Sequence, residues 1–450
     1  MLPLALILMM LQAVAPAAEP PLLQLAQPQG TAAPPALITL QDALDRAKRL
    51  NSQFQSAVTD AVVAREDRIQ AKSALLPAFN HTTQYLGTQG NGKAPSGRFV
   101  TNDGVHVYRS WAVAHQEIGA NTFLRTSYRR AQAAEALAAA KLEIAERGLN
   151  VTVTRNYYGL ITSQRKYGTA QQSLQQAQRF LDITQQQERA GQVAHSDVVK
   201  AQIQYELQRQ AFQEAALAVE NARLNLAVLL FSDLNENFTI VDDLDSPRDL
   251  PPFSEIQKRA GNQNPIIRVA LETLRQASLD VRGARNAFLP TLAIDTIYGI
   301  EANRFALKSE VAAAPQLGPL PNLGYFVTGN FSLPVFDWGT RRSKLRQAQA
   351  HEEQARVELT ETQRVLLGNL YLYYNEAQTA LAAADTLRRA ADLAAESLRL
   401  TNLRYQAGES TALEVVDAQK SLVDARNAYD DAQARYRVGI ATLQTISGEF

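Results

Sequence analysis

Glu414 and Asp417 are the pair of residues whose types and spacing best suit a chemical role. They are three positions apart, so on a helix the two carboxylates share one face. Acidic side chains gathered in this way can attract cations. Acidic residues also suit the first turn of a helix, where they complement the macrodipole. The spacing alone leaves both interpretations open.

No other combination of residues predicts catalysis or a metal site. His351-Glu352 begins like the zinc-protease motif, but Ala355 stands where the second histidine is needed. The glycine-rich run at 87–92 resembles a nucleotide-binding loop, but no helix is expected directly after it. The five histidines show no ligand spacing. The sequence therefore predicts that the protein is not an enzyme and has no metal or cofactor.

The balance of charge argues against a nucleic-acid-binding protein. The chain has 45 basic and 45 acidic residues among its 450, so its formal net charge is zero. A basic footprint for nucleic acid is therefore not indicated. The sequence contains no cysteine. This excludes disulfides, thiolate metal sites, a cysteine nucleophile and a lipid-modified cysteine.

The N-terminus is predicted to direct export. Residues 1–18 contain an apolar run from Leu4 to Leu11 and a small-residue cleavage site at Ala15-Pro16-Ala17. This resembles a secretory signal peptide that lacks the basic start. Residues 19–36 are rich in Pro, Ala and Gln and predict an extended linker. No later segment approaches the ~18 consecutive apolar residues of a membrane-spanning helix.

The long helices that must position Glu414 and Asp417 occur twice in the sequence. Two stretches, one in each half of the chain and related by a constant offset, carry apolar residues at every seventh position, namely Val198, Tyr205, Phe212, Val219 and Leu226, then Val415, Leu422, Tyr429, Tyr436 and Leu443. Heptads predict packed helices, and a pattern repeated at half the length predicts one unit built twice. We expect two structural repeats, 37–245 and 246–450.

Each repeat is predicted to begin with one helix that ends at a proline. Thr39 and Asp42 form a helix-start capping pair, and helical spacing continues to about Leu76, before Pro77. The second repeat has the same pattern from Ile256 to Leu289, before Pro290. After each proline the apolar period changes to two, which predicts β-hairpins at about 78–118 and 291–333.

A long helical hairpin is expected after each β-hairpin, at about 122–231 and 340–447. A helix of nearly 70 residues would be roughly 100 Å long, at 1.5 Å per residue. The strands are long enough to cross a bilayer at a tilt. Four strands cannot close a barrel, so several chains would have to pool them. The alternative is a secreted or periplasmic coiled-coil structural protein without a pore.

The sequence resembles the TolC family of bacterial outer-membrane efflux proteins over about residues 38–448. Besides the duplicated order of elements, two motifs carry the resemblance, Leu333-Pro334-Val335-Phe336-Asp337-Trp338-Gly339 and Tyr405-x-x-Gly408-x-x-x-x-Glu414-Val415-x-Asp417-Ala418. The first repeat departs from the family pattern, because Gln116-Glu117-Ile118-Gly119 replaces the Pro-x-Phe segment. The resemblance implies a mainly helical homotrimer whose chains pool a twelve-stranded β-barrel, above an α-barrel that crosses the periplasm.

The resemblance also implies a function and a place in the cell. The protein would be the exit duct of a tripartite efflux or type I secretion system in the outer membrane of a Gram-negative bacterium. It would passively conduct substrates received from an inner-membrane pump and a periplasmic adaptor, the membrane fusion protein. Opening would be an iris-like shift of the second helical hairpin. Drugs, metal ions and proteins all remain possible substrates.

The resemblance assigns roles to residues near the helical turns. In a trimer, Glu414 and Asp417 would place six carboxylates around the pore entrance, and Tyr405 would bond Asp197 in the closed state. Lys200 stands where the repeat would put a counterpart of Asp417, so only one hairpin supplies acids. The adaptor would dock on Gly191, Gln192, Val193, Ala194, His195 and Ser196 of the first turn, and on Gly408, Glu409, Ser410, Thr411, Ala412 and Leu413 of the second.

Overall fold

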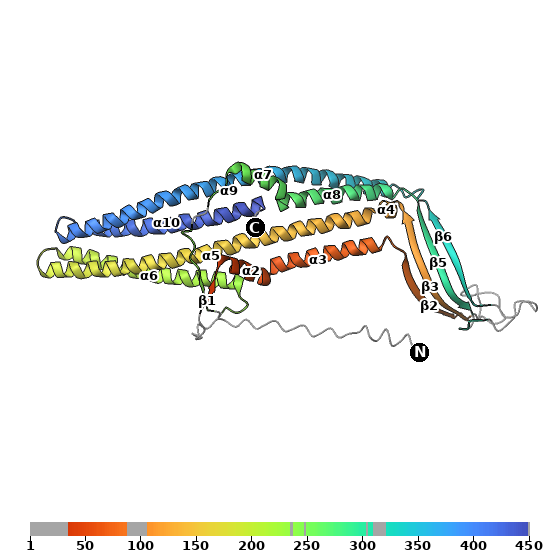
Figure 1. Cartoon of the computed structure of the whole chain (residues 1–450), viewed down its shortest axis with the longest axis horizontal. Coiled ribbons are helices and arrows are strands. Elements are labelled where there is room, and N and C mark those ends of the chain that lie inside the picture. Colours follow the sequence, from red (N-terminus) through yellow and green to blue (C-terminus); the bar gives the residue numbers. More distant parts are fainter. Residues whose placement is uncertain are drawn as a thin grey trace, which may run out of the picture.

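The protein is an elongated molecule with long helices along its length and a sheet at one end (Figure 1). The computed structural model describes residues 35–87, 106–234, 237–246, 249–302, 305–308 and 321–448. The expected signal peptide lies outside these residues, as does most of the expected linker. Ala36, the last residue of that linker, already belongs to the first strand.

Both halves of the chain carry the same order of long elements. The first half contains β1 (Ala36–Ile38), α2 (Leu40–Leu50), α3 (Ser52–Ser73), β2 (Ala78–Gly87), β3 (His106–Gly119), α4 (Ala120–Phe123), α5 (Thr126–Arg189) and α6 (His195–Leu230). The second contains β4 (Phe238–Ile240), α7 (Phe253–Gln263), α8 (Pro265–Asn286), β5 (Thr291–Ala302), β6 (Leu323–Ser332), α9 (Thr340–Gln406) and α10 (Ala412–Ser447). The predicted fold class, a duplicated helical hairpin with two β-hairpins, is confirmed.

The prediction of one continuous helix before each proline is wrong. The first is divided at Asn51 and the second at Asn264, which occupy corresponding positions of the two repeats. Each asparagine is an N-cap, because the Asn51 side chain accepts the N–H of Phe54 and the Asn264 side chain accepts that of Ile266. Asparagine is among the best N-cap residues, so it starts a new helix within an otherwise helical pattern.

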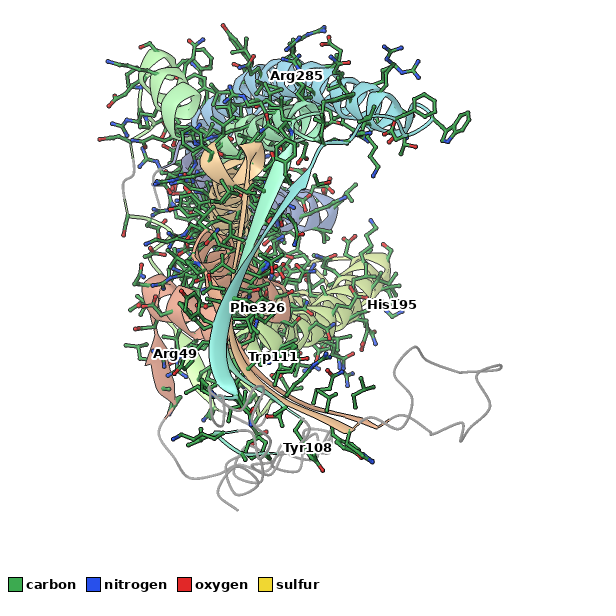
Figure 2. All side chains as sticks on the ribbon, turned by 90° about the vertical axis from the view of Figure 1, so that its right-hand side faces the viewer. Arg49, Tyr108, Trp111, His195, Arg285 and Phe326 are labelled. Atoms are coloured by element: carbon green, nitrogen blue, oxygen red, sulfur yellow. The ribbon has the colours of Figure 1, made fainter. Side chains whose placement is uncertain are left out.

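The four long strands form one antiparallel sheet in the order β2-β3-β5-β6. The pairing of β3 with β5 joins the two predicted hairpins, and it places Trp111 opposite Gly299. A Cβ on Gly299 would lie 2.1 Å from the carbonyl oxygen of Ser110, so only glycine fits there. The sheet is curved, and Trp111 and Phe326 lie within it with their ring centroids 6.1 Å apart (Figure 2). Within the described chain, β2 and β6 are edge strands.

The helices continue the same arrangement along the molecule. The helices α3, α5, α8 and α9 lie side by side next to the sheet, and α6 and α10 pack on α5 and α9 at the far end (Figure 1). A short parallel pair, β1 with β4, was not predicted. It covers a core that includes Tyr157, whose hydroxyl donates to the carbonyl of Val241 at 2.7 Å. No helix in the described parts of the chain is long and apolar enough to cross a membrane.

Candidate functional site at the helical tips

The two helical hairpins end in turns of the same geometry. Gly191 and Gly408 adopt φ angles of 72° and 76°, in the left-handed region that glycine occupies at little cost. The next N–H in each turn bonds back to the helix at 2.8 Å, from Gln192 to the carbonyl of Gln187 and from Glu409 to that of Arg404. This is the Schellman ending of a helix. The duplicated sequence thus builds two matching tips.

Most of the predicted adaptor-facing residues are exposed on these tips. Val193 and Ser410 are half-buried, and Ser410 donates to the carbonyl of Thr401 at 3.4 Å. Ala412 is 0% exposed, so its assignment to the adaptor-facing surface is wrong. Its methyl group packs in the cluster between the two hairpins. His195 is exposed and bonds Glu188 at 2.7 Å.

Tyr405 joins the two helical hairpins, but through a different partner from the predicted one. Its hydroxyl lies 3.2 Å from the Oγ1 of Thr184, and its ring centroid is 5.0 Å from that of Phe180. Burial raises the pKa of Tyr405 above its ordinary value. Asp197 instead accepts from the Nζ of Lys200 at 3.4 Å. The predicted hydrogen bond between Tyr405 and Asp197 is therefore not formed in this structure.

The contact of Tyr405 belongs to an apolar cluster that ties the tips together. The cluster draws buried side chains from α5, α6, α9 and α10, namely Phe180, Leu181, Val198, Ala201, Tyr405, Ala412 and Val415. The hydroxyl pair of Tyr405 and Thr184 lies within it. Any separation of the two tips would have to expose this surface or break that pair.

The two predicted ring carboxylates have different surroundings. Glu414 occupies the N3 position of a capping box whose N-cap is Thr411. Its carboxylate accepts from the N–H of Thr411 at 3.3 Å, and the Thr411 hydroxyl accepts from the N–H of Glu414. It also lies 3.6 Å from the Nη1 of Arg404. Asp417 is exposed, and its carboxylate has no hydrogen-bond or ion-pair partner among the described residues. The helix-start interpretation therefore holds for Glu414, and the attraction of cations by Asp417 stays a prediction.

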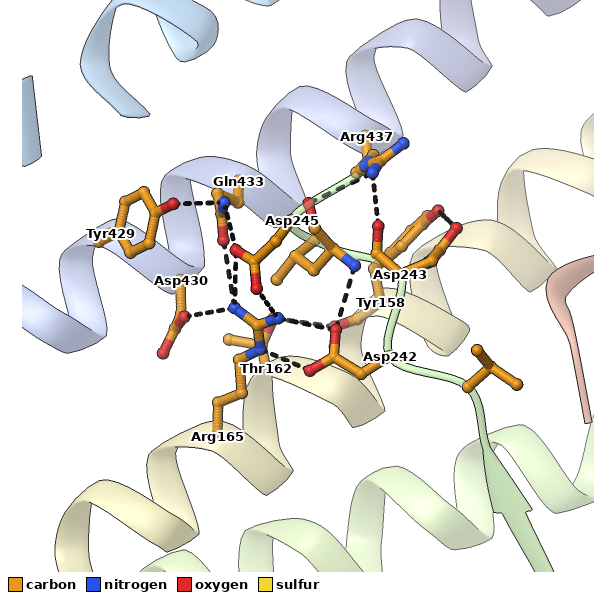
Figure 3. A network of polar contacts seen from close by, with 12 residues as sticks. Tyr158, Thr162, Arg165, Asp242, Asp243, Asp245, Tyr429, Asp430, Gln433 and Arg437 are labelled. Carbon is orange, nitrogen blue, oxygen red and sulfur yellow. Dashed lines mark hydrogen bonds and ion pairs between the residues drawn. The ribbon is translucent and has the colours of Figure 1, made fainter. Parts of the chain in front are cut away.

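A second polar site, which the sequence analysis missed, joins α5, α10 and the connection after β4 (Figure 3). Arg165 on α5 bonds both oxygens of Asp242 at 2.6 and 2.8 Å and reaches Asp245 at 2.7 Å. Its Nη1 is also 3.3 Å from Asp430 on α10. Arg437 donates to three carbonyls of the β4–α7 connection, including that of Asp243 at 2.6 Å. We call this set the Arg165 cluster.

Charge and burial act in opposite directions within the Arg165 cluster. Burial lowers the pKa of Arg165, but its hydrogen bonds to Asp242 and Asp245 outweigh burial and raise it. Burial raises the pKa of Asp430, against the hydrogen bond from Arg165. The hydrogen bond from Arg165 lowers the pKa of Asp245. The run of acids at 242–245 was the available signal, but its partners lie on helices that are distant in the sequence.

The described residues contain no group of three His, Asp or Glu side chains that could hold a metal ion. The contacts found at the tips and in the Arg165 cluster are apolar packing, ion pairs and hydrogen bonds.

Comparison with known proteins shows the family of the chain. The model of the outer membrane efflux protein family matches residues 43–230 and 257–449. The chain belongs to this family.

Two relatives of this outer membrane efflux protein match most of its length. Outer membrane protein TolC of Escherichia coli is 23% identical over 424 residues, which cover 91% of this chain and 82% of that protein. Pyoverdine export outer membrane protein OpmQ of Pseudomonas aeruginosa is 24% identical over 421 residues, which cover 90% of this chain and 85% of that protein. The predicted TolC-family membership is confirmed.

A solved structure shows the same fold. The CmeC outer membrane channel of Campylobacter jejuni matches with a TM-score of 0.77 at 21% identity, over 91% of this chain and 85% of that one. Members of the family are passive channels and not enzymes. This outer membrane efflux protein accordingly belongs in the outer membrane of a Gram-negative bacterium, where it serves as a channel for efflux or secretion.

Proposed function

We propose that this protein is the exit duct of a tripartite efflux or type I secretion system. It conducts substrates passively from a periplasmic adaptor and an inner-membrane pump to the exterior. The observation that supports this best is a curved four-stranded sheet, with both edges open, continued by helices of 64 and 67 residues. A secreted coiled-coil protein has no use for such a sheet. In this proposal the pump, and not the duct, selects the substrate.

The duct is a homotrimer in this proposal. The free edges of β2 and β6 lie on opposite sides of the sheet, so the β6 edge of one copy can pair with the β2 edge of the next. Open strand edges are not tolerated in lipid, and closure removes them. Three copies with four strands each form a barrel of twelve. The edge helices α3 and α9 meet between copies in the same order.

The entrance of the duct is gated at the tips. The second hairpin, α9 with α10, moves away from α5 and α6 in an iris-like opening. The bond between Tyr405 and Thr184 holds the closed position, in place of the bond first expected with Asp197. Asp417, whose carboxylate has no partner among the described residues, supplies the acidic ring, and Glu414 adds a second carboxylate at the start of the same helix. The turn residues other than the buried Ala412 meet the adaptor.

Conductance in planar bilayers tests the duct. Purified full-length protein is expected to give discrete single-channel steps. The double substitution Glu414→Gln with Asp417→Asn is expected to shift the reversal potential in a salt gradient towards lower cation selectivity. If no steps appear and the protein fractionates as soluble, the duct is refuted and the coiled-coil structural protein takes its place. Unchanged reversal potentials with intact steps refute the acidic ring alone.

A further inference from the structure

Large apolar side chains are exposed at the four passages between the long strands and the helices. Trp338 is 90% exposed, Phe123 is 83% exposed and Phe336 is 71% exposed. Leu76 and Leu289, which precede the two prolines, are exposed as well. They lie at or next to the ends of α3, α4 and α8 and just before α9, and these ends face the sheet (Figure 1). We call this set the apolar belt. Exposed apolar surface of this extent marks contact with a partner or a membrane.

The backbone presents part of the apolar belt in the same way in both repeats. Arg125 and Trp338 are the two non-glycine residues with positive φ in the described chain, at 53° and 56°. At the offset of 213 that also relates Asn51 to Asn264, they occupy corresponding positions of the two repeats, and Phe123, not Gly119, is the counterpart of Phe336. A left-handed conformation is costly for such side chains and persists only where neighbouring contacts hold it. Asp337 does so beside Trp338, since its carboxylate accepts from Gly339 and Arg341.

Basic residues lie next to the apolar belt, in the adjoining turns of the helices. They are exposed, and their side chains have no hydrogen-bond or ion-pair partner in the part of the chain that the structure describes. These residues, which we call the basic collar, are Lys72, Arg125, Arg129, Arg282, Arg285, Arg342, Lys344 and Arg346. The whole chain has a formal net charge of zero, so the collar is a local excess of positive charge. In Figure 2 Arg285 lies on the helices, beyond the upper end of the sheet.

We propose that the basic collar binds anionic phospholipid headgroups of the membrane leaflet nearest the helices. The apolar belt would enter the acyl boundary of that leaflet, and the collar would lie at its phosphates. The order along each passage, from strand to apolar side chain to cation, matches the order of layers in such a leaflet. Five of the eight collar residues and both αL positions lie on α5 and α9 or directly before them. Guanidinium groups bind phosphate through paired N–H donors.

Tryptophan fluorescence can report which lipid lies beside the collar. The chain has two tryptophans, so Trp111→Phe leaves Trp338 as the only one. The full-length protein is reconstituted in phosphatidylcholine bilayers that contain the same mole fraction of either brominated phosphatidylglycerol or brominated phosphatidylcholine. Because cations near an anionic surface attract its lipids, the brominated phosphatidylglycerol is expected to quench Trp338 about twofold more strongly. High salt is expected to reduce that difference.

Two matched triple variants distinguish the loss of collar cations from the loss of the same number of positive charges elsewhere in the protein. In the Trp111→Phe background, Arg342→Gln with Lys344→Gln and Arg346→Gln is expected to make the two lipids quench equally. The control, Arg364→Gln with Arg388→Gln and Arg389→Gln, removes three exposed cations from the same helix far from the sheet and is expected to keep the preference. Equal quenching before any collar substitution, no quenching by either lipid, or loss of preference in the control overturns the proposal. Conductance is measured separately, so a failed collar is distinguishable from a failed duct.

Discussion

Arg165 and Asp430 meet across the two halves of the chain, with the Nη1 of one 3.3 Å from the Oδ1 of the other. The contact fixes the middle of α10 to α5 and to the connection after β4. Nearer the tips, the hydroxyls of Tyr405 and Thr184 form a single hydrogen bond in the apolar cluster. The strong attachment therefore lies away from the entrance and the weak one lies close to it. This arrangement suits a second hairpin that pivots at the Arg165 cluster and opens at its tip.

Removing Arg165 is expected to destabilise the protein strongly. The Asp430 side chain is only 10% exposed, so Arg165→Met leaves a buried carboxylate without its cation. Breaking a buried pair in this way costs about 3–5 kcal/mol. The midpoint of thermal unfolding, followed by circular dichroism in detergent, should fall accordingly. Arg155→Met, at an exposed arginine without an ion-pair partner among the described residues, is the control and should change little. Stability equal to that of the unsubstituted protein would show that Arg165 does not hold α10.

Asp245 is expected to give the Arg165 cluster a dependence on pH. The pKa of Asp245 in the folded protein lies below its ordinary value of 3.8. Its contribution to stability is therefore complete above 3.8 and is lost as the pH falls through the lower, folded pKa. The melting midpoint of Asp245→Asn should be lower than that of the unsubstituted protein at neutral pH, and the gap should close in acid. Since the Asp245 side chain is 64% exposed, the gap should be small and should shrink with salt.

Asp430 shifts in the opposite direction and enters this comparison. Burial raises the pKa of Asp430, so its ionisation makes the protein less stable as the pH rises, and the charge of Asp245 raises that pKa further. Asp245→Asn removes this second effect, which makes the gap at neutral pH smaller but leaves its closure in acid. A gap that stays constant down to strong acid would show that Asp245 acts through packing and not through its charge.

Asp417 and Glu414 should affect ion selectivity unequally. Glu414 is engaged with Thr411 and Arg404, whereas the Asp417 carboxylate has no partner in the described chain. Asp417→Asn should therefore shift the reversal potential more than Glu414→Gln does. Glu414→Gln should also leave thermal stability nearly unchanged, because the glutamine side chain can still accept from the N–H of Thr411 in the capping box. Equal shifts in reversal potential would mean that Glu414 leaves its cap in the trimer.

Tyr405→Phe tests the tie at the entrance. The substitution removes one buried hydrogen bond and keeps the ring against Phe180. Thr184 still donates to the carbonyl of Phe180 at 2.8 Å. The loss of about 1 kcal/mol corresponds to about a fivefold shift of a two-state equilibrium towards the open entrance. Open probability in planar bilayers should rise by that order. Tyr371→Phe, whose exposed ring packs on Phe253, is the control, and an equal rise there would count against the tie.

Periodicity predicted the long elements well, because the burial of one helix face or one strand face recurs along many residues. Single-residue events were harder to predict. The helix breaks at Asn51 and Asn264 depend on one side chain each, within a pattern that stays helical on both sides. The partner of Tyr405 and the cluster around Arg165 depend on which helices become neighbours. Tertiary contacts decide that, and spacing along the chain does not record them.

Arg125 offers a test of strain at the passage from β3 to α5. The left-handed conformation costs about 1–2 kcal/mol for a residue with a Cβ and almost nothing for glycine. Glycine also gives the unfolded chain more freedom, and this offsets part of the gain in stability. Arg125→Gly should still raise the thermal midpoint, measured in detergent free of anionic lipid. Arg129→Gly, four residues later inside α5, should lower the midpoint, because glycine in a helix interior lowers the free energy of unfolding by about 1 kcal/mol. The same residue is introduced for the same cation, so only the backbone conformation distinguishes the two variants. A fall in both midpoints would mean that Arg125 holds its conformation without strain.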